Sequence, residues 1–291
     1  MSFPAPTSTI HQILARGLCI DAAPEMRAHH PRAQFWIPAA SASPWEGFTL
    51  KAILAAYGDI LEGTTMATPN DMTIRVFNVE RLANIKDMLA VYIHRLMPQP
   101  LEIGRKCLAP RLGLRLDARP IEVTQNPQVG PGRPPMMLRY DGQPLVIAAV
   151  RTRSDWSSQN PHGTGLFDQL LGYANEGSTR YGFAATDAEF VVTQTYTVND
   201  EMAIRYHAIP IDASGIDQVT PALALWCLAM MALNPHHRTP GPEEETYSFN
   251  TWYVDVRENG EVTYMHHLSR VVRSTIPPIE GRRLLPRPQS E

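Results

Sequence analysis

The spacing of apolar residues predicts two amphipathic helices in the first third of the chain. Within residues 49–61, and again within 78–97, apolar side chains recur at intervals of three and four residues. Pro98 and Pro100 follow the second segment directly, and we expect them to end that helix because proline cannot continue the hydrogen-bonding pattern.

Beyond residue 135 the apolar period changes from that of helices to that of strands. The segments "MMLRY" and "PLVIAAVRT" are joined by "DGQ", and an Asp-Gly turn between apolar runs predicts a β-hairpin. The second strand is apolar on both faces, which places it in the middle of a covered sheet. A helix over 165–177, with Gly177 at its end, and two strands within 181–198, with a turn at Asp187, complete this part.

The last third of the chain contains one strongly apolar segment and a second hairpin. "PALALWCLAMMAL", residues 221–233, predicts a buried helix with Thr220 as its N-cap and Pro221 in its first turn. Its length falls short of the roughly 20 residues that span a bilayer, so no membrane partner is expected. Residues 251–268 predict a hairpin that turns at Asn259 and Gly260.

These patterns together predict an α/β protein of the α+β type, with a mixed central sheet flanked by helices. Residues 1–45 are rich in Pro, Ala, Ser and His, with a short helical pattern near residues 10–16, and we expect a loosely packed arm. Residues 46–275 are expected to form a single globular domain, and 276–291 a Pro/Arg-rich tail.

Composition narrows the classes of function only slightly. The net charge of −3 provides no overall basic field, so nucleic acid would have to bind to a local patch. Three widely spaced cysteines without a CxxC spacing argue against a disulfide framework and a zinc site. Without an apparent signal peptide, we expect an intracellular location, in the cytoplasm or the nucleus.

Three pairs of adjacent histidines raise the question of a metal site. They are His29–His30, His236–His237 and His266–His267. Neighbouring side chains point apart on a helix and to opposite faces of a strand, so we expect no metal ligands from these pairs. The expectation from the sequence is therefore no bound metal and no cofactor.

Residues 130–195 resemble the PD-(D/E)XK nuclease superfamily, in particular its RecB-like members and related fungal domains of unassigned role. The resemblance rests on the hairpin "MMLRYDGQPLVIAAVRT", on Trp156 shortly after it, and on the following helix and strands. In that helix Gln169 and Tyr173 fit the Q-x-x-x-Y pattern of RecB-like enzymes. The resemblance implies a restriction-endonuclease-like fold.

The resemblance also implies where a catalytic site would lie. In the family, an acid on the first strand and a second at the end of the next strand hold a divalent cation, usually Mg²⁺, that activates water. A lysine two residues after the second acid lies on the same face. In this chain residues 135–138 contain no acid, Ala149 takes the place of the second acid, and Arg151 takes the place of the lysine.

The sequence therefore leaves three hypotheses open. The first is a catalytically degenerate nuclease-like protein that binds DNA, RNA or a protein partner. Arginine retains its charge and binds phosphate well, and the residues expected at a nucleic-acid site are Arg151, Arg153, Trp156, Gln169 and Tyr173.

The second hypothesis is an active nuclease, dependent on Mg²⁺ or Mn²⁺, with relocated acids. Asp155 and Asp141 are the leading candidates for those acids. Asp59 and Glu62 could line the same cleft, whereas Asp168 and Glu176 are expected on the solvated face of their helix. The third hypothesis is a structural scaffold or homodimer that associates through the helix 221–233 or the terminal hairpin.

Overall fold

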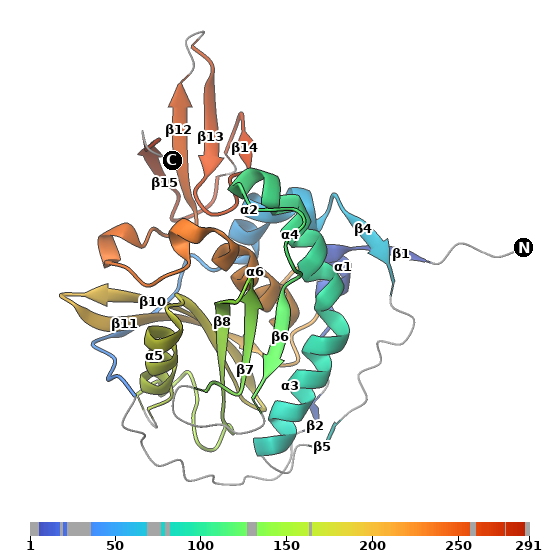
Figure 1. Cartoon of the computed structure of the whole chain (residues 1–291), viewed down its shortest axis with the longest axis vertical. Coiled ribbons are helices and arrows are strands. Elements are labelled where there is room, and N and C mark those ends of the chain that lie inside the picture. The colour runs from blue at the N-terminus through green and yellow to red at the C-terminus, as the bar shows by residue number, and fades with distance from the viewer. Residues whose placement is uncertain are drawn as a thin grey trace, which may run out of the picture.

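The architecture comes from a computed structural model of the chain (Figure 1). The structure describes the following residues: 6–17, 20–21, 36–68, 77–78, 82–126, 133–162, 165–256, 260–276 and 278–288. Within this part of the chain, helices and mixed sheets confirm the α+β class.

A seven-stranded sheet forms the centre of the protein, in the order β3-β11-β10-β9-β8-β7-β6. The β8–β9 and β3–β11 pairs are parallel and the other neighbours are antiparallel. The strands are β3 (Ala42–Pro44), β6 (Glu122–Gln125), β7 (Met136–Tyr140), β8 (Gln143–Val150), β9 (Tyr181–Ala185), β10 (Glu189–Val198) and β11 (Glu201–Pro210).

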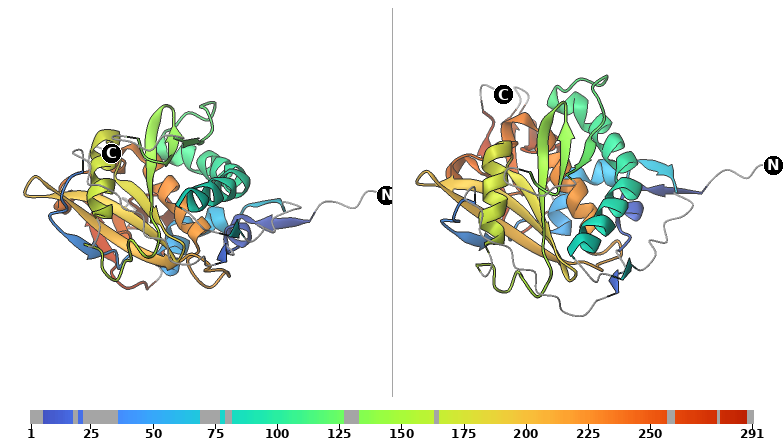
Figure 2. Two further views of the ribbon diagram at one scale, coloured as in Figure 1. Left: turned by 90° about the horizontal axis from the view of Figure 1, so that it is seen from below. Right: turned by 60° about the horizontal axis from the view of Figure 1, so that its bottom comes forward.

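Helices cover both faces of this sheet (Figure 2). They are α1 (Ile10–Leu14), α2 (Leu50–Leu61), α3 (Leu82–Leu96), α4 (Pro98–Leu112), α5 (Leu166–Gly177) and α6 (Pro221–Leu233), with short 3₁₀ turns at Pro235–His237 and Glu243–Glu245. Helix α5 packs on one face and α6 on the other. None of the helices within the described residues is long and apolar enough to cross a membrane.

Strand β8 lies in the interior of the sheet, as the sequence predicted. Its side chains point alternately into two separate cores. Val146, Ala148 and Val150 belong to the large core on the α6 face, whereas Ile147 and Ala149 belong to a smaller core under α5. Because successive strand residues point to opposite faces, each of the two cores takes alternate residues of the same strand. The side chain of residue 151 follows the same alternation onto the α5 face.

Smaller sheets lie outside the central one. One has the order β14-β13-β12-β15, from β12 (Thr251–Val256), β13 (Val262–His266), β14 (Val272–Arg273) and β15 (Arg283–Pro286). The other two are pairs: β1 (Thr7–Thr9) with β4 (Thr65–Ala67), and β2 (Ile20–Asp21) with β5 (Phe77–Asn78). The second predicted hairpin is confirmed by the β12–β13 pairing, and Gly260 has the left-handed φ of 80° expected at its turn.

The expectation of a loosely packed arm over residues 1–45 is wrong for the described segments. Helix α1 buries Ile10, Ile13 and Leu14 completely, and its capping box at Thr9 satisfies the first-turn amide groups. Strand β3 joins the central sheet beside β11. Part of the tail is also ordered, since β15 pairs with β12.

Candidate functional site

Ala149, which the sequence resemblance aligns with the family's second acid, lies in the apolar core under α5. Ala149 is only 1% exposed and packs among the residues that α5 presents to the sheet. Its strand neighbour on the same face is Ile147, whose cross-strand partner is Met137 on β7. The segment that would supply the first acid therefore also presents an apolar side chain here. At Ala149 itself the closely packed apolar side chains offer a cation neither a carboxylate ligand nor space.

Arg151, in the place of the family's lysine, is also an interior residue. Its side chain is 4% exposed. Nη1 donates to the carbonyl of Val150 at 2.9 Å, and Nη2 donates to Oε1 of Gln169. Nε2 of Gln169 in turn donates to the Tyr173 hydroxyl at 2.9 Å. Three of the five residues expected from the sequence to contact nucleic acid are thus joined in one buried series of hydrogen bonds.

Burial changes the titration of both ends of this series. It lowers the pKa of Arg151, and the nearby Tyr173 and Asp155 partly oppose that change. It raises the pKa of Tyr173, against the effect of the hydrogen bond from Gln169. Arginine nevertheless remains protonated in proteins, so the fold holds a buried positive charge next to a neutral phenol.

Trp36, in the N-terminal part of the chain, lies against Arg151. The ring of Trp36 lies 5.9 Å from its guanidinium carbon, a distance at which a cation and an aromatic face attract. The segment is fixed to α5, because the Ile37 amide donates to the Asp168 carbonyl and the Ala39 amide donates to its carboxylate, both at 3.1 Å. Asp168 is therefore an anchor for this segment, not a side chain of a purely solvated face.

Trp156 and Arg153 do not form the expected surface patch. Trp156 is 3% exposed, packs edge to face on Phe167 at 5.4 Å, and donates from Nε1 to the Pro161 carbonyl at 3.2 Å. It covers the end of α5 and cannot stack on a base. Arg153 is exposed, but its guanidinium forms an ion pair with Asp187 at 3.3 Å.

The two candidate relocated acids lie at opposite ends of β8. Asp141 is exposed in the hairpin turn with a φ of 49°, as predicted for a turn-forming residue. Asp155 lies beyond the other end of the strand and accepts a hydrogen bond from the Thr152 hydroxyl at 2.6 Å. An eight-residue strand between them corresponds to roughly 25 Å, so these carboxylates cannot share one cation.

The other acids considered from the sequence lie elsewhere. Asp59 forms an ion pair with Arg111 of α4. Glu62 is exposed, with one oxygen 4.0 Å from Nδ1 of His11. Within the described ranges, no three side chains of His, Cys, Asp or Glu are grouped in a way that could hold a metal ion.

The histidine pairs have different environments. His29 and His30 lie outside the described residues, and His236 is exposed. His237, His266 and His267 are buried and come together from the 3₁₀ turn Pro235–His237 and the end of β13. The ring centroids are 4.9 Å apart for His237–His267 and 5.2 Å for His266–His267. The sequence shows the histidine pairs but not this cluster, because only the tertiary fold brings His237 to His266 and His267.

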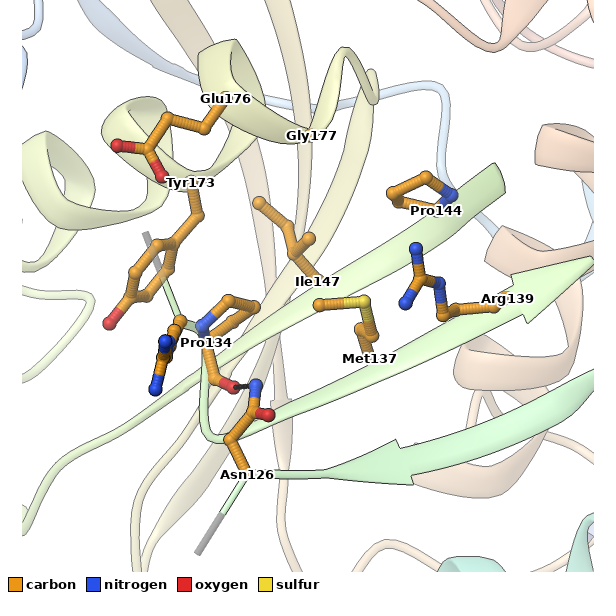
Figure 3. A pocket seen from close by; sticks show the side chains of 10 residues that line it. Asn126, Pro134, Met137, Arg139, Pro144, Ile147, Tyr173, Glu176 and Gly177 are labelled. Carbon is orange, nitrogen blue, oxygen red and sulfur yellow. Dashed lines mark hydrogen bonds between the residues drawn. The ribbon is translucent and has the colours of Figure 1, made fainter. Parts of the chain in front are cut away.

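A pocket of about 450 Å³ lies between the sheet and the C-terminal half of α5 (Figure 3). It is lined by residues from the end of β6, from the β7–β8 hairpin and from α5: Asn126, Arg133, Pro134, Met137, Arg139, Pro144, Ile147, Tyr173, Glu176 and Gly177. Tyr173 therefore connects the buried hydrogen bonds of Arg151 and Gln169 to this pocket. Met137 and Ile147 form its floor on the same sheet face as Ala149.

The rim of this pocket carries both signs of charge. Arg133 is exposed, and Arg139 is half-buried with Nη2 donating to the Gly142 carbonyl at 2.9 Å. Glu176 contributes one carboxylate from α5. Neither arginine was a candidate in the sequence, although the family's first strand begins close to both.

Comparison of this chain with models of protein families, with curated proteins and with solved structures gives no match. The functional argument therefore rests on the fold and on the geometry of this pocket.

Proposed function

We propose that this chain is a PD-(D/E)XK-like protein that has lost its catalytic carboxylates and acts by binding nucleic acid. The observation that carries the proposal is the burial of Ala149, at the place of the family acid, in an apolar core. The order β7, β8, α5, β9, β10 within a mixed sheet supports the resemblance. It is the order of strands and helix that the sequence resemblance implies.

Loss of the acids removes cation binding, but phosphate binding needs only positive charge and hydrogen-bond donors. The pocket in Figure 3 lies on the α5 side of the sheet, which is the side that the family resemblance assigns to the substrate. Arg133 and Arg139 supply two guanidinium groups at its rim, and guanidinium matches phosphate geometry with paired N–H donors. We assign nucleic-acid contact to this rim and not to the buried Arg151.

The test is a binding titration with labelled single- and double-stranded DNA and RNA, followed by fluorescence anisotropy over a series of salt concentrations. Each phosphate contact contributes about one unit to the slope of log affinity against log salt. The double variant Arg133→Gln, Arg139→Gln is expected to bind more weakly, with a slope reduced by about two units.

Arg119→Gln provides a matched control, because Arg119 is exposed and is not among the residues that line this pocket. It removes one positive charge outside the pocket, where the double variant removes two within it, and it should leave the slope of log affinity against log salt unchanged. Equal loss of affinity in the control and in the double variant would show a general charge effect and would reject the assignment of the site. Absence of binding by the wild-type protein would reject the proposed function.

One observation favours a second candidate function, a scaffold that forms homodimers. Four of the six large apolar side chains that are exposed within the described residues lie on the small C-terminal sheet: Val256, Val262, Val272 and Leu284. Val256 and Val262 are direct cross-strand partners, so these two side chains lie next to each other on one face of the sheet. Molecular mass in solution across a range of concentrations tests this candidate, and a constant monomer would reject it.

A further inference from the structure

A second pocket, of about 1040 Å³, shares no residue with the proposed nucleic-acid site. Three segments that lie far apart in the sequence form its walls. The first (44–51) runs from the end of β3 into α2, the second (243–250) leads from a 3₁₀ turn towards β12, and the third (278–283) leads into β15. The volume is at the upper end of the range for small-molecule sites, so the pocket has room for a ligand larger than a single ion.

Hydrogen bonds hold the walls of this pocket together. Nη2 of Arg205, on β11, donates to Oε1 of Glu243 at 2.8 Å, and this ion pair fixes the second wall to the central sheet. Nδ2 of Asn250 donates to the carbonyls of Ile279 and Glu280 at 3.4 and 3.5 Å, which joins the second wall to the third. The pocket is therefore a built part of the fold.

Charges of both signs line this pocket without pairing with each other. Lys51 lies in the first turn of α2, and Glu244 and Glu280 lie on the other two walls. All three side chains are exposed, and none of them forms an ion pair with another residue that the structure describes. Glu46 and Arg283 add one further charge of each sign. A ligand that carries both signs can pair with both groups, whereas a simple cation or anion would be repelled by one of them.

The N-terminus of α2 is suited to bind a carboxylate. Its first turn contains no acidic side chain. Thr49 accepts a hydrogen bond from the Ala52 amide at 3.3 Å, but the amides of Leu50 and Lys51 have no acceptor inside the helix. Such amide groups, together with the helix dipole, attract an anion. The ammonium group of Lys51 adds a full positive charge at the same end of the helix.

A buried donor in the wall points to a ligand independently of these charges. Trp45 lines the pocket and is only 3% exposed, and within the described part of the chain its indole Nε1 has no hydrogen-bond partner. A buried indole N–H ordinarily has an acceptor. The carbonyl oxygen of a peptide group that enters the pocket would supply one.

We propose that this pocket binds a short peptide with free termini. Lys51 and the N-terminus of α2 bind the carboxylate of the peptide, Glu244 and Glu280 bind its ammonium group, and the indole of Trp45 donates to one of its carbonyls. This ligand accounts for the unpaired charges of both signs and for the unpaired indole N–H. The site does not depend on the proposed nucleic-acid function, because the two pockets share no residue.

Isothermal titration calorimetry of the full chain tests this proposal. The ligands are tri-alanine, N-acetyl-tri-alanine, tri-alanine amide and the peptide blocked at both ends. Tri-alanine is expected to bind with a Kd below about 1 mM. Blocking either terminus should weaken binding about tenfold, because it removes a charge-assisted contact. Equal affinity for tri-alanine and the doubly blocked peptide, or no binding of any of the four, would overturn the proposal.

Two variants assign the ends of the peptide. Lys51→Gln should weaken the binding of tri-alanine about tenfold without weakening that of tri-alanine amide, which has no carboxylate. The double variant Glu244→Gln, Glu280→Gln should weaken the binding of tri-alanine without weakening that of N-acetyl-tri-alanine, which has no ammonium group. A general loss of stability would weaken the binding of all the peptides alike, so this pattern reports the contacts themselves.

Control variants remove equal charge outside the pocket. Arg119→Gln removes one exposed positive charge, and Glu201→Gln with Glu245→Gln removes two exposed carboxylates. Both controls should bind tri-alanine like the wild type, and circular dichroism establishes that each variant is folded. Wild-type affinity for tri-alanine in either pocket variant would overturn the assignment of that terminus. A loss of affinity in the controls equal to that in the pocket variants would reject the site, because it would show a general charge effect.

Discussion

The cluster of His237, His266 and His267 predicts that the protein loses stability in mild acid. Burial lowers the pKa of His237 and of His266 to about 3, and that of His267 well below its usual value. Neighbouring Arg270 and Arg273 add to this effect by repulsion. The native state therefore keeps all three rings neutral at pH values where the unfolded chain already binds protons.

The sign and the size follow from this difference. In the unfolded chain a histidine titrates near pH 6.5, so the stability that these neutral rings contribute is complete above that pH and falls as the pH drops towards 3. Between pH 7 and pH 5 each ring accounts for a loss of about 2 kcal/mol. Three rings together account for about 6 kcal/mol, a large part of the stability of an ordinary domain.

Urea unfolding followed by tryptophan fluorescence at pH 7 and pH 5 measures this loss. His267→Phe is the informative variant, because within the part of the chain that the structure describes neither ring nitrogen of His267 meets a hydrogen-bonding partner in suitable geometry, and an apolar ring leaves no polar group unpaired. The variant should lose about 2 kcal/mol less than the wild type between the two pH values. His94→Gln, at an exposed position, should behave like the wild type.

An equal loss between pH 7 and pH 5 in His267→Phe and in the wild type would refute this reasoning. It would mean that the unfolded and native states bind the same number of protons at this position. Carboxylates contribute little to the comparison, because they titrate mainly below this interval.

Two further predictions concern packing and the buried chain of hydrogen bonds. Gly104→Ala should destabilise the protein by about 1–2 kcal/mol in thermal unfolding. The reason is that the new Cβ would lie 2.7 Å from Sδ of Met230 and 2.8 Å from the Trp226 ring. An unchanged melting temperature would show that the contact between α4 and α6 can relax. Gln169→Leu should cost about 3 kcal/mol by leaving the Arg151 guanidinium without its side-chain acceptor, and a neutral effect in urea unfolding would show that the hydrogen bond contributes nothing.

The sequence predicted the elements whose signals are local. The Asp141–Gly142 turn, with φ values of 49° and 76°, joins β7 and β8 where the Asp-Gly pair indicated. Thr220 caps α6 by accepting a hydrogen bond from the Leu223 amide at 3.2 Å. These signals depend only on neighbouring residues, so they are readable without tertiary information.

Other elements were missed because their sequence signals are ambiguous. Pro98 and Pro100 were expected only to end a helix, yet α4 begins at Pro98, where a proline in the first turn needs no amide partner. Strand β3 is three residues long and forms only when β11 lies beside it. Short edge strands of this kind depend on tertiary pairing and leave little local pattern.

The candidate site was predicted in part. The sequence placed Gln169 and Tyr173 in the same candidate site as Arg151, and in the structure hydrogen bonds join the three side chains. It could not predict that Trp36, more than a hundred residues earlier in the chain, covers the arginine. Exposure is a property of the whole fold, and for this reason four of the five residues expected at the surface, namely Arg151, Trp156, Gln169 and Tyr173, lie in the interior.

We propose that this chain binds nucleic acid without cleaving it. The most direct test incubates purified, folded protein with labelled single- and double-stranded DNA and RNA in Mg²⁺ or Mn²⁺, with a chelator as control. We expect no cleavage above the chelator control in the wild type or in Asp155→Ala, together with binding in the anisotropy titration. Cleavage that requires the metal ion and disappears in Asp155→Ala would contradict the account and establish a rebuilt catalytic site.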